Sequence, residues 1–434
     1  MLDRSIKATG DDVMVAKLAT MQAGYYVDPF LDAFSQSDDD GSYTPMRGSS
    51  AASSRAGAGQ TRNGRRRTVQ PIIKRGTHAR VCVIDRALSG FLKMMIHEFP
   101  DADACQVVVL GAGKDTSYFR CRNGNLMGMQ EQKDETKIEG IEPINQQQQK
   151  QQQRRQNMHT TNQPKVHWHD VDHVSVIKEK ASLIRKSNLL KSFCPLLVKT
   201  ASGYECVDAP KRLSFSNEMK SSSSSSPTYH LVGHDLRDSP MILLEKLNLN
   251  PTLPTLFIME CVSMYIPITE SKSLLQALSV SADTVFIACY EPIIGTGDPF
   301  GQVMERNLVK RGVASPECCL LQTRTLHDQL EKLVECEGFL RAVGCDMWSA
   351  YETIVTGAQR KRANQSEFMD EYEEWILIMR HYCFVVAQGG RSPCPQTRST
   401  SSLTTVQDPN GNDKTSSFLG WVSGKCLQLE KPPE

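Results

Sequence analysis

Short runs of apolar residues alternate along the chain with stretches whose apolar residues recur at helical spacing. The runs are rich in β-branched residues and predict seven strands, at residues 106–110, 166–171, 229–233, 254–261, 284–290, 339–345 and 381–387. Amphipathic helices are predicted at residues 85–99, from Thr269 onward, at 300–311, at 321–336 and from Ser366 onward. This alternation predicts an α/β sandwich with a largely parallel sheet. The closing strand–helix–strand order favours an antiparallel edge strand.

Three segments of low complexity interrupt this pattern. They bury too little apolar surface to offset the entropy cost of ordering them, so we interpret them as inserts. The first has acidic, small and basic residues, the second has glutamine tracts, and the third has six consecutive serines. The resulting division is an N-terminal helical segment (1–35), an insert (36–70), a main domain (71–388) with inserts at about 121–164 and 211–227, and a polar tail (389–434).

Composition narrows the class of partner. The chain has 434 residues and a formal net charge of +1, which gives no overall attraction to nucleic acid or to an anionic membrane. It has no apolar run long enough to span a bilayer and begins without the apolar stretch of a signal peptide. Fourteen cysteines occur without a C-x-x-C pair, which favours free thiols in a reducing compartment. We expect a cytoplasmic monomer without nucleic-acid or membrane partners.

The first candidate for chemistry is the turn at Gly111-Ala112-Gly113, which follows a buried strand. Glycines at a strand end let the backbone approach a ligand closely. Asp115 and Thr116 stand where a dinucleotide-binding turn would have its third glycine, which disfavours a nicotinamide cofactor. Taken alone, the turn fits a ligand loop and a plain tight turn equally well.

Acidic residues at the end of the next predicted strand form a second candidate. Asp172, or less favourably Asp170, stands where a carboxylate commonly binds ribose hydroxyls, although an exposed loop carboxylate fits as well. His167, His169 and His173 lie nearby and raise the alternative of a metal site. Because no cysteine or further ligand stands at a standard spacing, we predict no metal.

Two more strand ends carry polar residues. Asp235 and Leu236 could bind an adenine through a carboxylate and a backbone amide, or simply form an Asx turn that caps a helix. Glu260 ends a continuous apolar strand, where an unpaired carboxylate is costly. Its partner is either a cationic group of a ligand or a structural ion pair with Arg80 or Lys17.

Seven motifs occur in an order that is more specific than any one of them. They are Gly24–Phe30 (GYYVDPF), Arg75–Val81 (RGTHARV), Leu110–Thr116 (LGAGKDT), Asp235–Asp238 (DLRD), Pro254–Cys261, Tyr290–Glu291 with Asp298–Met304, and Arg380–Cys383. Together they resemble the leucine carboxyl methyltransferase family. The resemblance covers roughly residues 11–35, 71–120, 166–184 and 228–388.

The resemblance implies a fold and an activity. The fold is that of a Rossmann-like class I methyltransferase, with a seven-stranded, mostly parallel sheet, an antiparallel edge strand and helices on both faces. The family uses S-adenosyl-L-methionine to methylate the C-terminal leucine carboxylate of catalytic subunits of type 2A protein phosphatases. Two alternatives stay open, namely a related methyltransferase with another substrate such as tRNA, and a non-catalytic binding protein with this fold.

The resemblance also implies roles for residues around the reacting groups. Lys17 and Arg80 would hold the carboxylate of the methionine part of the cofactor, and Glu260 would meet its amino group. Tyr265 would lie near the site of methyl transfer, so Tyr265 and Arg80 are the candidate catalytic residues.

The remaining implied roles concern the nucleoside part of the cofactor. Gly111 would line the cofactor at the first strand turn. Asp172 would bind the ribose, and Asp235 and Leu236 would contact the adenine.

Overall fold

A computed structural model describes residues 2–35, 69–126, 164–207, 228–312, 315–336, 338–391 and 427–430. All seven predicted strands are present, and they belong to a sheet of ten. The strands are β1 (Ala104–Leu110), β2 (Lys165–Asp172), β3 (Leu196–Lys199), β4 (Gly203–Val207), β5 (Tyr229–Gly233), β6 (Thr255–Glu260), β7 (Val285–Pro292), β8 (Arg341–Asp346), β9 (Tyr382–Gly389) and β10 (Leu427–Glu430). Their order across the sheet is β10-β8-β9-β7-β6-β1-β2-β5-β4-β3.

The centre of the sheet is parallel, as predicted. β5, β2, β1, β6 and β7 pair in parallel, and β9 is antiparallel to both of its neighbours, β7 and β8. The antiparallel strand therefore lies inside the sheet, and its predicted position at the edge was wrong. The last predicted strand in the chain was expected at the edge of the sheet. Instead, β9 inserts between two earlier strands, β7 and β8, where both of its faces are buried.

Three further strands extend the sheet beyond the seven that the sequence predicted. The hairpin of β3 and β4 continues it past β5, and β10 pairs with β8 at the other edge. β3 escaped prediction because its apolar run, Leu196 to Val198, is only three residues long and too short to show a period. β10 comes from the segment that composition assigned to a polar tail.

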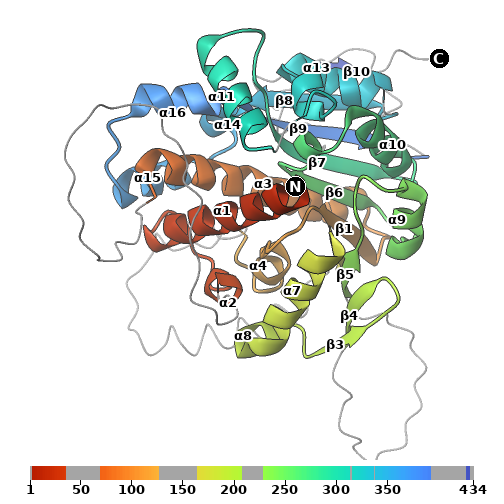
Figure 1. Ribbon diagram of the computed structural model, residues 1–434. Helices are drawn as coiled ribbons and strands as arrows, with labels where there is room; N and C mark the ends of the chain where they lie inside the picture. The colour runs from red at the N-terminus through yellow and green to blue at the C-terminus, as the bar shows by residue number, and fades with distance from the viewer. Residues whose placement is uncertain are drawn as a thin grey trace, which may run out of the picture.

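Helices cover both faces of the sheet (Figure 1). The α-helices are α1 (Leu2–Gln22), α2 (Leu31–Ser35), α3 (Pro71–Glu98), α4 (Ser117–Arg122), α7 (Val174–Lys186), α8 (Asn188–Lys191), α9 (Pro240–Leu247), α10 (Ile268–Ser279), α11 (Pro299–Lys310), α12 (Cys319–Gln322), α13 (Leu326–Glu331), α14 (Met347–Thr353), α15 (Gly357–Ser366) and α16 (Tyr372–Met379). A 3₁₀ turn, η2 (Ser263–Tyr265), follows β6, and a π-helical turn, η3 (Lys332–Cys336), follows α13.

Several helix boundaries differ from the prediction for identifiable reasons. α3 begins at Pro71 rather than at residue 85, because the first half of its buried face carries polar residues that hide the apolar stripe. The helix predicted for residues 321–336 is divided, since Thr325 forms a capping box that starts a new helix. Ser366 ends α15 instead of starting α16, so its predicted capping role was wrong.

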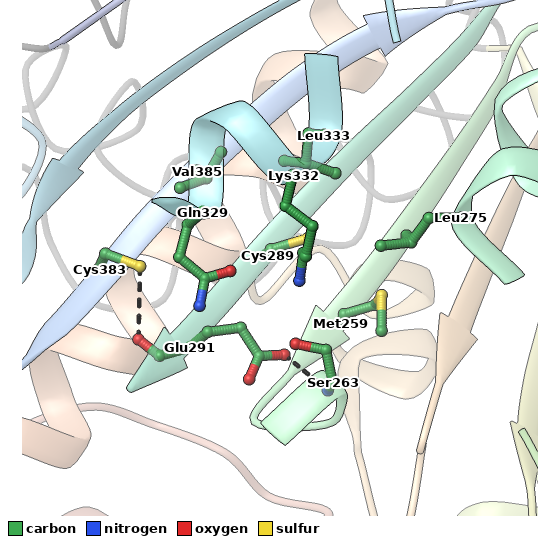
Figure 2. A pocket seen from close by; sticks show the side chains of 10 residues that line it. All are labelled: Met259, Ser263, Leu275, Cys289, Glu291, Gln329, Lys332, Leu333, Cys383 and Val385. Carbon is green, nitrogen blue, oxygen red and sulfur yellow. Dashed lines mark hydrogen bonds between the residues drawn. The ribbon is translucent and has the colours of Figure 1, made fainter. Parts of the chain in front are cut away.

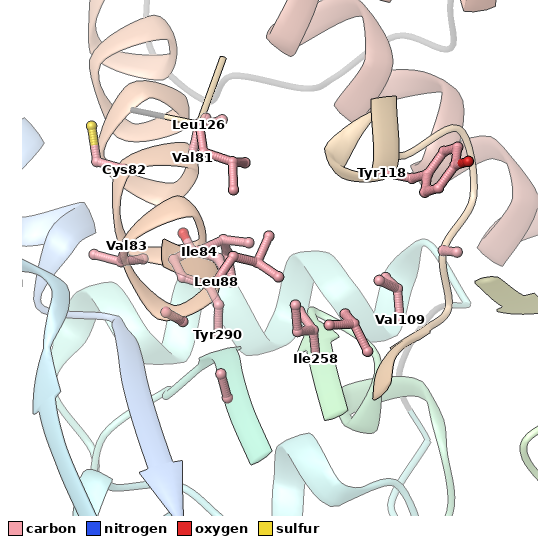
Figure 3. Packing of buried hydrophobic residues seen from close by; sticks show 14 of the residues in the cluster. Val81, Cys82, Val83, Ile84, Leu88, Val109, Tyr118, Leu126, Ile258 and Tyr290 are labelled. Atoms are coloured by element: carbon pink, nitrogen blue, oxygen red, sulfur yellow. The ribbon is translucent and has the colours of Figure 1, made fainter. Parts of the chain in front are cut away.

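Alternate residues of the central strands face two separate cores. Val107 and Val109 pack on the side of α1 and α3, whereas Val108 and Leu110 pack on the side of α9 and α10. Figure 3 shows Leu88 of α3 above the first of these faces. Strands buried on both sides are typical of a parallel sheet between helical layers.

The predicted inserts fall almost wholly outside the described residues, and so does most of the polar tail. Within the described part, no helix combines the length and the apolar character that a membrane span requires.

Candidate functional site

The carboxyl ends of the parallel strands bring the predicted site residues to one edge of the sheet. Leu110 of β1 is in register with Met259 of β6, so Gly111 and Glu260 follow at the same level. Asp172, which ends β2, is in register with Gly233 of β5. Open α/β sheets bind their ligands at this edge.

Glu260 forms ion pairs with two cations that come from helices. Lys17 of α1 places its Nζ 3.2 Å from Glu260 Oε2, and Arg80 of α3 donates from Nε to Glu260 Oε1. Lys17 Nζ also lies 3.9 Å from Asp115 Oδ2. Burial alone would raise the pKa of Glu260, but the two cations outweigh burial and lower this pKa to about 2. Glu260 is therefore an anion at neutral pH.

Arg80 also contacts an aromatic ring, one of a stacked pair that the sequence did not assign to the site. Its guanidinium carbon lies 5.0 Å from the ring centroid of Tyr290, and this ring stacks on Tyr382 with 5.3 Å between centroids. Burial opposes the charge on Arg80, but Glu260 keeps its pKa above the ordinary value. Both tyrosines belong to motifs that carry the family resemblance, and these motifs were the only sign in the sequence that the two residues lie near the site.

Tyr265 lies in η2, five residues after Glu260. Burial raises the pKa of Tyr265 to about 12, and the nearby thiol of Cys261 acts in the same direction. The hydroxyl group is consequently protonated at neutral pH and can donate a hydrogen bond.

The glycine turn after β1 requires backbone conformations that side chains disfavour. Gly111 has φ of 65° and Gly113 has φ of 47°, both in the left-handed region. A Cβ atom on Gly111 would lie 2.5 Å from Cγ2 of Val262, whereas a Cβ on Gly113 would meet nothing within 4 Å. Gly111 is therefore fixed by close packing as well as by its φ angle.

Asp172 closes this turn from the neighbouring strand. Its Oδ2 accepts from the Gly113 backbone N–H at 2.7 Å, and its Oδ1 accepts from the His173 N–H at 2.6 Å. Burial raises the pKa of Asp172, and the two hydrogen bonds oppose that rise.

Asp170 has a different environment from Asp172. Its carboxylate is buried and binds Lys180 Nζ at 2.7 Å, and it accepts from Trp168 Nε1 at 2.9 Å and from the Tyr229 hydroxyl at 2.6 Å. Lys180 in turn donates to the backbone carbonyl of Asp115 at 2.8 Å. Asp170 therefore supports the glycine turn from behind.

Asp235 is held by the side chain and the backbone of Arg237. Its Oδ1 accepts from the Arg237 N–H at 3.0 Å and from Nε at 2.9 Å, and its Oδ2 accepts from Nη2 at 2.5 Å. These bonds lower the pKa of Asp235. The Asx turn is thus formed, and Leu236 beside it is 9% exposed. A quarter of the Asp235 side chain (24%) is exposed to solvent at the same edge as Asp172.

The histidines near β2 are arranged differently from a ligand set. His169 stacks on His230 with 4.6 Å between ring centroids, and His173 caps the start of α7. Within the described ranges, three side chains lie close enough together to bind a metal ion at His327, Asp328 and Glu331, on the surface of α13. Asp328 already forms part of the capping box that starts this helix.

Comparison with known proteins gives a family match. The sequence model of the leucine carboxyl methyltransferase family matches residues 8–131 and 152–279, which together make up more than half of the chain. The chain belongs to this family. It is accordingly an S-adenosylmethionine-dependent methyltransferase.

Similar proteins extend over nearly the whole chain. Leucine carboxyl methyltransferase 1 of Yarrowia lipolytica is 25% identical over 388 residues, which cover 89% of this chain and 97% of that protein. The Arabidopsis thaliana homolog is 26% identical over 387 residues (88% and 89%), and the Rattus norvegicus enzyme is 25% identical over 392 residues (89% and 91%).

A small cavity lies behind the site of this methyltransferase, on the side of the sheet that α10 and α13 cover (Figure 2). Its volume is about 10 Å³, enough for a single water molecule and far too small for a nucleoside. Its lining includes Glu291, the buried last-but-one residue of β7. The cavity is therefore separate from the site at Glu260.

Proposed function

We propose that this chain is a protein carboxyl O-methyltransferase that esterifies the α-carboxylate of the C-terminal leucine of type 2A protein phosphatase catalytic subunits. The observation that carries the proposal is the cluster of Lys17, Arg80 and Glu260 at the carboxyl edge of the sheet. The names of the relatives support the leucine carboxylate as acceptor. The phosphatase is what the resemblance of the sequence motifs implies.

The donor set fits the amino-acid end of S-adenosyl-L-methionine. That end has one carboxylate and one ammonium group, and the cluster offers two cations and one anion within one ion-pair network. We assign the carboxylate to Lys17 and Arg80, and the ammonium group to Glu260. Until the cofactor binds, Glu260 pairs with both cations, which reduces the cost of burying them.

The nucleoside end would lie along the same edge of the sheet. We assign the backbone at Gly111 to the cofactor, Asp172 to the ribose, and Asp235 with Leu236 to the adenine. The Asp235 side chain stays 24% exposed beside Arg237, so an exocyclic amine can reach its carboxylate. The close approach that Gly111 permits would be lost with any side chain.

The chemistry requires positioning more than acid–base catalysis. When bound, the cofactor supplies an electrophilic methyl carbon on a sulfonium. The acceptor carboxylate has an ordinary pKa of about 3.5, so it is already an anion at neutral pH and needs no general base. Tyr265 retains its proton at this pH, so it can donate to a carboxylate oxygen and orient it. Arg80 contributes positive charge that attracts the acceptor.

We infer that the protein works in the cytoplasm as a monomer, without nucleic-acid or membrane partners. The eleven cysteines whose side chains the structure describes form no disulfide with one another, which favours a reducing compartment.

A transfer assay tests the proposed function. The protein is incubated with methyl-labelled cofactor and a phosphatase catalytic subunit, either complete or without its last leucine. We expect base-labile label on the complete subunit alone, because a methyl ester hydrolyses in base. Label that remains on the truncated subunit, label on added RNA, or no label at all would contradict the proposal.

A further inference from the structure

A buried glutamate outside the site accepts hydrogen bonds from the backbone turn that leads to Tyr265. We propose that Glu291 is a positioning residue for methyl transfer, acting through the turn formed by residues 261–265. The inference rests on the proposed function, since it concerns the rate of that reaction.

Glu291 binds the turn through two backbone amides. Its Oε1 accepts from the Val262 N–H at 3.0 Å and from the Ser263 N–H at 2.9 Å, and the residue is 2% exposed. Cys261 starts the turn with φ of 56°, in the left-handed region, and donates its N–H to the Tyr290 carbonyl at 2.7 Å. A non-glycine residue in this conformation is strained and needs such support.

The same turn connects several parts of the site. Glu260 precedes it directly, and Tyr265 ends it in η2. In the middle, the Val262 side chain packs against the Cα of Gly111, in the space that a Cβ would fill. A shift of this turn would therefore displace Tyr265, whereas Glu260 stays held by its ion pairs with Lys17 and Arg80.

The other oxygen of the carboxyl group shows that burying this group has a cost. Within the described part of the chain, Glu291 Oε2 accepts no hydrogen bond, and Glu291 lines the cavity of about 10 Å³. Figure 2 shows Lys332 and Gln329 extending toward this carboxylate from the helical segment above it. Burial raises the pKa of Glu291, and the charge of Lys332 opposes the rise.

The cost of burying Glu291 indicates which role this residue has. An apolar residue at this position would remove a buried ionisable group, and replacing buried ionisable groups with apolar residues is often neutral or stabilising. It would also leave the Val262 and Ser263 amides without an acceptor. We infer that the carboxylate is present to fix the turn rather than to stabilise the core.

Two variants of similar volume separate these roles. Glu291→Gln keeps an acceptor oxygen and Glu291→Leu removes it, and each is combined with Lys332→Met so that no unpaired cation is buried. We expect kcat to be at least about tenfold lower in E291L/K332M than in E291Q/K332M, since two backbone hydrogen bonds distinguish them. We expect the Kd for S-adenosyl-L-methionine, measured by calorimetry, to differ by less than about threefold. Equal kcat values in the two variants would overturn the inference.

Two further measurements keep the outcome interpretable. If E291L/K332M does not fold, Glu291→Asp replaces it, because the shorter side chain withdraws the carboxyl group from the turn without removing it. We expect a lower kcat, and an unchanged kcat in this variant would count against the inference. The unmodified protein is assayed in parallel, and its inactivity toward the phosphatase would refute the proposed function.

Amide hydrogen exchange tests the effect on the turn without any substrate. We expect residues 261–265 to exchange faster in E291L/K332M than in E291Q/K332M.

Discussion

The backbone N–H of Gly113 donates to Asp172 Oδ2 across 2.7 Å, and this bond joins the turn after β1 to the end of β2. The carboxylate thereby fixes the glycine turn and still lies at the edge where a ribose would bind. Two residues earlier on the same strand, Asp170 is buried against Lys180 and supports the turn from behind. Two carboxylates of one short segment thus have separable roles.

Replacement of these two aspartates should separate ligand binding from stability. Asp172→Asn should weaken binding of S-adenosyl-L-methionine about tenfold, because an amide has one acceptor oxygen instead of two. Asp170→Asn should lower the free energy of unfolding by about 3 kcal/mol, because it leaves Lys180 buried without its anion. Calorimetry and urea unfolding measure the two effects. A larger loss of stability in D172N than in D170N would reverse the assignment.

Arg80→Ala should weaken cofactor binding by about 100-fold, or about 3 kcal/mol, since it removes one partner of a buried charge pair. Calorimetry with S-adenosyl-L-methionine measures the change. His97→Ala is a suitable control, because His97 is exposed in the last turn of the same helix. Binding by R80A that matches the control would exclude Arg80 from the cofactor site.

Glu260 should make stability depend on pH in a defined direction. Its pKa falls from 4.5 to about 2 on folding, so the stabilisation is complete above about pH 5 and is lost as the pH falls toward 2. Each pKa unit corresponds to about 1.4 kcal/mol, which gives about 3 kcal/mol at neutral pH. The gap in unfolding free energy between the unmodified protein and Glu260→Gln should narrow by about 1 kcal/mol between pH 7 and pH 3.5.

Urea unfolding of the ligand-free protein at several pH values measures this gap. Glu317→Gln provides the control, because Glu317 is an exposed glutamate. Its difference from the unmodified protein should stay small throughout. A constant gap for E260Q over the same pH range would show that Glu260 does not titrate as described.

The sequence predicted those parts of the molecule that leave a local pattern. The seven central strands are apolar runs, and the residues at their carboxyl ends meet because parallel strands end at one edge. Contacts between distant segments leave no such pattern, so Tyr290 and Tyr382 beside Arg80 were missed. Glu291 was also missed, because its role depends on the amides of a turn 28 residues earlier. The position of β9 depends on pairing across the whole sheet, which periodicity does not encode.

The two glycines of the β1 turn give a matched pair for the last prediction. Both have left-handed φ angles, so an alanine at either position is strained, at a cost of about 1 kcal/mol. A Cβ at position 111 would also lie 2.5 Å from Val262, a stiff β-branched residue, whereas one at position 113 has open space. Gly111→Ala should therefore lower stability and cofactor affinity more than Gly113→Ala does.

A second substitution tests the cause of that difference. Val262→Ala removes the methyl group that the new Cβ of G111A would meet, so the double variant G111A/V262A should recover part of the cofactor affinity that G111A loses. Thermal unfolding and calorimetry on the four proteins form a double-mutant cycle. Additive effects of G111A and V262A would mean that the two side chains do not compete for the same space, and that the φ angle alone accounts for glycine at this position.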